Sequence, residues 1–177
     1  LSADSTNLYF VNGLMESSLN NLQKIEDLRV ISRTSVEQYR NTTLKASEIA
    51  RDLQVNYLVE GSGQRMDNQV LLNIQLINAA TETPIWAEQY NYEIEDVFEL
   101  QNTIAKHIAE AVKAKITPDE LKQIDKKPTT NLVAYDYYLK GLDQFQLKTE
   151  EGLHDAISLL KQAVKEDNEF ALAYANM

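Results

Sequence analysis

The hydrophobic positions of the first 53 residues change from helical to strand-like spacing and back. Apolar side chains recur every three or four residues over 4–24, which predicts a helix. The run LRVISR at 28–33 is rich in β-formers and predicts a strand. Residues 44–53 again predict a helix. Because that helix can supply a right-handed crossover, strand 28–33 is expected to pair in parallel with segment 56–65.

Residues 55–92 repeat with a period of two, which is typical of half-buried strands. The pattern predicts three strands, 56–65, 69–78 and 84–92, in an antiparallel meander. Asp67-Asn68 predicts a tight hairpin turn between the first two. The expected fold is therefore α/β, with a mixed sheet that combines a parallel βαβ start with this meander and is flanked by helices.

The helical period returns after the meander. An apolar stripe runs from Val97 to about residue 115, and Thr117 followed by Pro118 predicts the start of a short helix. The polar segment 122–131 then predicts a boundary. We expect three parts: an α/β domain over 1–116, a linker with a short helix over 117–131, and an all-α segment over 132–177.

The all-α segment carries a repeat-like pattern. An aromatic residue is followed by Gly141 in the first helix, and Ala156, Leu160 and Ala163 recur in the second. Residues 171–174 (ALAY) look like the opening of another copy. The segment resembles a tetratricopeptide repeat, in which small residues let two antiparallel helices approach closely. An ordinary helical hairpin is the alternative.

Charge and composition narrow the classes of function. The chain has 177 residues, of which 27 are Asp or Glu and 17 are Lys or Arg, so its formal net charge is −10. This balance argues against binding to nucleic acid or to an anionic membrane. There is no Cys and there are only two His, which excludes disulfides, cysteine-ligated metals and multi-histidine sites.

Two motifs could bind a ligand, but each has a simpler interpretation. Gly61-Ser62-Gly63 begins like a dinucleotide-binding loop, but Met66 replaces the third glycine and a hairpin follows. A strand bulge or a close backbone approach is the simpler interpretation. An acidic cluster surrounds the start of the helix after the meander, where carboxylates favour the helix dipole; it consists of Glu93, Glu95, Asp96 and Glu99.

Single residues give no clearer signal. His107 and His154 are expected to be exposed on helices, and Trp86 is expected to be a core or wedge residue rather than a ligand platform. Asn41-Thr42-Thr43 has the form of a glycosylation acceptor. We therefore expect no catalytic, cofactor-binding or metal-binding residues, and no cofactor.

Several local motifs of residues 4–115 occur in a recognisable order. They are YFxxGL at 9–14, LRVISRTS at 28–35, EIAxxLxVxYLVEGS at 48–62, QLINA at 75–79, IWAExY at 85–90 and VFxLQxxIA at 97–105. Together they resemble the TolB-like amino-terminal domain that precedes tetratricopeptide repeats in bacterial signalling proteins. The resemblance implies a non-catalytic module that accompanies an adenylate cyclase or a DNA-binding domain, and it implies no catalytic residues.

Two functions are expected on this basis. The first is a sensor or protein-interaction module of a signalling or transcription-regulatory protein, with a protein partner bound by the repeats. The alternative is a small-ligand receptor, with a site near Trp86 and Gly61–Gly63, coupled to an upstream cyclase or DNA-binding effector. Association into a homo-oligomer is possible in either case. The resemblance leaves both the bacterial cytoplasm and the periplasmic side of a membrane-anchored protein open.

The ends of the sequence also carry expectations. The chain begins with Leu1 rather than Met, so we interpret it as part of a longer protein. The family resemblance implies a strand before helix 4–24, whose absence would leave a sheet edge unpaired and prone to self-association. Ala171, Leu172 and Tyr174 are expected to form an exposed apolar stripe on the last helix.

Overall fold

The computed structural model describes residues 8–40 and 42–177 of the chain. Its elements divide into two compact units. Of the described residues, those up to Leu14 and Asp125–Met177 form one unit, called the helical unit here, and those from Met15 to Ile124 form the other, the sheet unit. The division falls inside α1 (Leu8–Leu22), which contributes residues to both units.

The sheet unit is built on three antiparallel strands in the order β1-β2-β3. They are β1 (Tyr57–Met66), β2 (Gln69–Asn78) and β3 (Thr83–Glu93). β1 and β2 are joined by the two residues Asp67 and Asn68, and Asp67 has a positive φ of 50°, as a tight hairpin turn requires. The predicted meander is therefore confirmed.

The two faces of the sheet differ because successive side chains of a strand point to opposite sides. The closed face carries the buried side chains of the central strand, Val70, Leu72, Ile74 and Leu76, each at most 2% exposed. The open face carries polar residues, such as Asn73 and Gln75 of the same strand.

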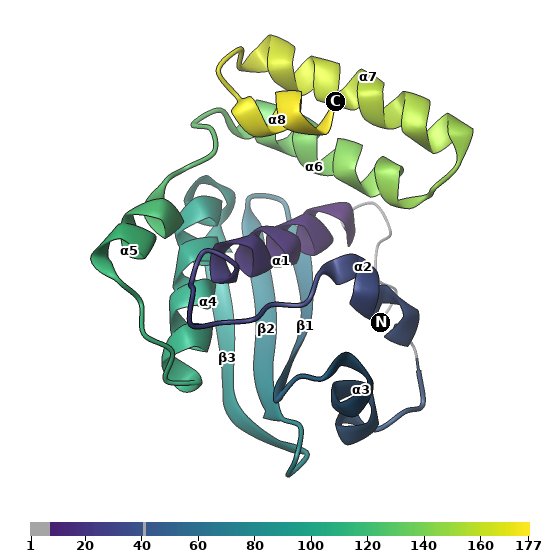
Figure 1. The fold of residues 1–177 in the computed structure, drawn as a ribbon. Helices are drawn as coiled ribbons and strands as arrows, with labels where there is room; N and C mark the ends of the chain where they lie inside the picture. Colours follow the sequence, from purple (N-terminus) through teal and green to yellow (C-terminus); the bar gives the residue numbers. More distant parts are fainter. Residues whose placement is uncertain (1–7, 41) are drawn as a thin grey trace. The chain divides into compact units, whose positions relative to one another are not determined.

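Helices cover the closed face. α4 (Val97–Ala111) packs against β3 and buries a stripe that includes Leu100, Ile104 and Ile108. Figure 1 shows α4 and α1 on the same side of the sheet. The second half of α1 lies over β1. A Cβ added to Gly61 of β1 would lie only 3.1 Å from the Met15 methyl group of α1. This close contact, rather than a nucleotide-binding loop, explains why position 61 is a glycine.

The predicted parallel strand pair is wrong. Residues 28–32 form no strand, and α2 (Arg33–Val36) begins where strand 28–33 was expected to end. β1 pairs only with β2 in the described part of the chain. The segment is held instead by a side chain: the Arg29 guanidinium donates to the carbonyls of Leu53 and Gln54, at the end of α3 (Ala46–Leu53). High β-propensity alone does not form a strand, because a strand needs a neighbouring backbone with which to pair.

Among the remaining helical elements, α3 and α5 were predicted from the sequence, and α2 and two 3-10 turns were not. Short α2 and a single 3-10 turn, η2 (Glu37–Tyr39), lie between α1 and α3, and a second such turn, η3 (Ile94–Asp96), precedes α4. α5 (Pro118–Asp125) begins after Thr117, whose side chain and backbone exchange hydrogen bonds with Glu120. This is the predicted cap with Pro at the first helical position. The expected boundaries at 116 and 131 stay a prediction.

The helical unit contains the antiparallel pair α6 (Leu132–Gln146) and α7 (Glu150–Glu166), followed by α8 (Ala171–Asn176). The Asn131 side chain caps α6 by accepting from the backbone N–H groups of Val133 and Ala134, and it donates to the Glu166 carbonyl, 2.9 Å away. One residue therefore fixes the start of α6 against the end of α7.

Residues 4–7 of the first predicted helix, Asn41 of the glycosylation acceptor, and any strand before the helix lie outside the described residues. Within the described residues, no helix has the length and apolar character needed to cross a membrane.

Candidate functional site

The α6–α7 pair approaches closely through small residues. A Cβ on Gly141 would lie 3.1 Å from Leu160 Cγ and 3.3 Å from the Ala156 carbonyl oxygen. Ala156 and Ala163 are at most 1% exposed. The predicted role of these small residues is confirmed, since a side chain at position 141 would push the two helices apart.

An aromatic cluster holds α8 against this pair. The rings of Tyr138 and Phe170 are 5.0 Å apart, and Tyr135 stacks on Tyr138. Phe170 and Ala173 are fully buried. Because Phe170 and Ala173 face the α6–α7 pair, the opposite side of α8 is exposed to solvent.

The first half of α1 completes the helical unit by packing on α6. A Cβ on Gly13 would lie only 2.6 Å from Leu139 Cδ2, so Leu139 occupies the space that a side chain at position 13 would need. The Tyr9 hydroxyl donates to Asp136 at 2.7 Å, and the same carboxylate pairs with Lys140 at 2.8 Å. The Lys140 ammonium also lies over the Tyr9 ring. α6 therefore has one face on α7 and another on α1.

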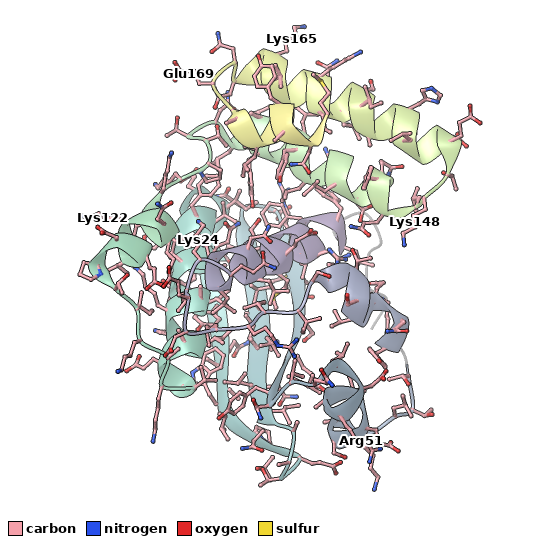
Figure 2. All side chains as sticks on the ribbon, viewed as in Figure 1. Lys24, Arg51, Lys122, Lys148, Lys165 and Glu169 are labelled. Atoms are coloured by element: carbon pink, nitrogen blue, oxygen red, sulfur yellow. The ribbon has the colours of Figure 1, made fainter. Side chains whose placement is uncertain are left out.

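The outer surface of the helical unit carries large apolar side chains. Each is between 45% and 57% exposed: Phe145, Leu147, Leu153, Leu172 and Tyr174. Together they are called the apolar surface set here. The exposed stripe expected at Leu172 and Tyr174 is confirmed. Figure 2 labels three charged residues of the same unit: Lys148 in the α6–α7 turn, Lys165 near the end of α7, and Glu169 in the turn before α8.

On the closed face of the sheet unit, three polar groups contact one another at the edge of β3. His107 Nδ1 lies 2.8 Å from the Tyr90 hydroxyl and 2.9 Å from Glu88 Oε2, and the Tyr90 hydroxyl donates to the same carboxylate at 3.0 Å. The Trp86 ring is 6.2 Å from the His107 ring in a T-shaped arrangement. These groups satisfy one another and fasten α4 to β3.

The environment of Tyr90 makes the free energy of unfolding depend on pH. Burial, followed by the hydrogen bond to the Glu88 carboxylate, raises the pKa of Tyr90 well above its ordinary value of 10.0. The unfolded chain therefore ionises this phenol near pH 10 while the folded chain keeps it neutral.

We expect the free energy of unfolding to fall as the pH rises above about 10. Tyr90→Phe removes the phenol that ionises, so the free energy of unfolding of this variant should fall less over the same pH range. At neutral pH the same substitution should cost about 1 kcal/mol, because it removes one hydroxyl from the Glu88 contact. Urea denaturation between about pH 8 and about pH 11 measures both effects. Tyr57→Phe, at an exposed tyrosine, is the control; identical pH profiles for the two variants would contradict the assignment.

The open face of the sheet has a shallow hollow of about 470 Å³. Polar residues from all three strands line most of it, among them Glu60, Ser62, Asn73, Gln75 and Gln89. Gln75 already donates to Glu60 at 2.8 Å. We call this site the polar hollow.

The sequence-predicted residues do not meet at one site. Gly61 pairs with buried Ile74 and Trp86 pairs with buried Leu76, so both positions belong to the closed face, but they lie on the two edge strands with β2 between them. His154 is exposed as predicted. His107 is only partly exposed, and its Nδ1 is bonded to Glu88. Glu88 and Tyr90 were missed, although the period of two places both on the face of Trp86.

The acidic cluster surrounds η3 and the first turn of α4, and its four carboxylates are exposed. In the described part of the chain, no group of three or more His, Asp or Glu side chains is arranged to hold a metal ion.

Comparison with known proteins shows a distant relative. A protein named "Putative adenylate cyclase 3" from Rhizobium meliloti (strain 1021) is 28% identical over 177 residues, which is 100% of this chain and 30% of that protein. The chain is similar to a segment of an adenylate cyclase. No family model matches it.

The similarity covers both units, because it extends over the whole chain. It confirms the expected link to adenylate cyclases at the level of a distant relative, and it names no family. The chain spans less than a third of that adenylate cyclase. The TolB-like resemblance stays a prediction.

Proposed function

We propose that the chain is a non-catalytic interaction segment of a larger adenylate-cyclase-type signalling protein, and that its helical unit binds a protein partner. The observation that carries this proposal is the apolar surface set, which lies on α6, the α6–α7 turn, α7 and α8. Exposed apolar surface on a folded unit is a feature of interaction sites, and we propose that role for these side chains.

Two further observations support the proposal. Residues 132–177 keep the repeat pattern of small and aromatic positions, and stacked helical repeats form surfaces that bind peptides. In the cluster of Glu88, Tyr90 and His107, the Tyr90 hydroxyl, the Glu88 carboxylate and His107 Nδ1 contact one another. These bonds fasten α4 to β3, so we assign the cluster a structural role rather than that of an activated nucleophile.

The proposal is tested by partner capture from a bacterial lysate, with the full chain as bait. We expect a retained protein whose yield falls tenfold or more with Leu172→Glu plus Tyr174→Glu, since charges at an apolar contact remove its binding energy. Lys165→Glu, at another exposed helical position, is the matched control and should capture normally. Equal capture by both variants would count against a helical binding surface.

A second candidate is a small-ligand receptor, favoured by the polar hollow. Its amide, hydroxyl and carboxylate groups would bind a polar ligand through hydrogen bonds. A ligand present at 100 times its dissociation constant would stabilise the sheet unit by about 2.7 kcal/mol. A thermal-unfolding screen with polar metabolites therefore discriminates this function from the first. Ala87→Arg, which fills the hollow, should abolish any such shift.

A further inference from the structure

We draw no further inference here: the strongest candidate, the polar hollow on the open face of the sheet, already belongs to the second candidate function, and nothing in the described structure shows what covers it.

Discussion

Leu139→Ala is expected to lower the free energy of unfolding of the helical unit by about 2–5 kcal/mol, as truncation of a buried leucine does. Leu139 is 1% exposed and fills the space above Gly13 of α1. The loss therefore has two parts, the apolar area no longer buried and the cavity left between α1 and α6. Urea denaturation followed by far-ultraviolet circular dichroism measures it.

Gly13→Ala provides the matched partner for a double-mutant cycle. In the wild-type background the new methyl group would lie 2.6 Å from Leu139 Cδ2, and we expect a destabilisation of about 1–3 kcal/mol from overpacking. In the Leu139→Ala background the space is free, and alanine favours a helix interior over glycine by about 1 kcal/mol. The substitution should then be neutral or stabilising. Additive effects would show that α1 and α6 are not in contact.

Leu72→Ala is expected to have a comparably large effect on the sheet unit, about 2–5 kcal/mol. Leu72 lies on the closed face of β2, is fully buried, and faces Tyr90 across the sheet. Its chain neighbour Asn73 points to the open face, so Asn73→Ala should change stability by no more than about 0.5 kcal/mol.

The fluorescence of Trp86, the only tryptophan of the chain, reports this unfolding from β3. The two variants, Leu72→Ala and Asn73→Ala, test the register of the sheet directly, because a shift by one residue would exchange its two faces. If Asn73→Ala cost as much as Leu72→Ala, the assignment of the faces would be wrong.

Local patterns predicted those elements whose partners are close in sequence. The alternation of Val70, Leu72 and Leu76 identified β2, and the two residues Asp67 and Asn68 fixed the hairpin to β1. Gly141 and Ala156, on helices joined by a short turn, indicated the α6–α7 contact. In each case the residues themselves specify geometry, through period, turn conformation or size.

Contacts between distant parts of the chain could not be predicted in this way. Nothing near Gly13 indicates that Leu139, more than a hundred residues later, will occupy the space above it. The bond from His107 to Glu88 likewise depends on how α4 lies on β3. The strand predicted at 28–33 was wrong for the same reason, since β-propensity does not indicate which backbone is available for pairing.

The central claim is that the helical unit, and not the sheet, contacts a partner. Hydrogen–deuterium exchange of the full chain, with and without the captured protein, tests it most directly, because bound surfaces exchange more slowly. We expect protection concentrated in α7 and α8, around Leu153, Leu172 and Tyr174. Protection confined to β1–β3 around the polar hollow, with unchanged exchange in both helices, would contradict the account.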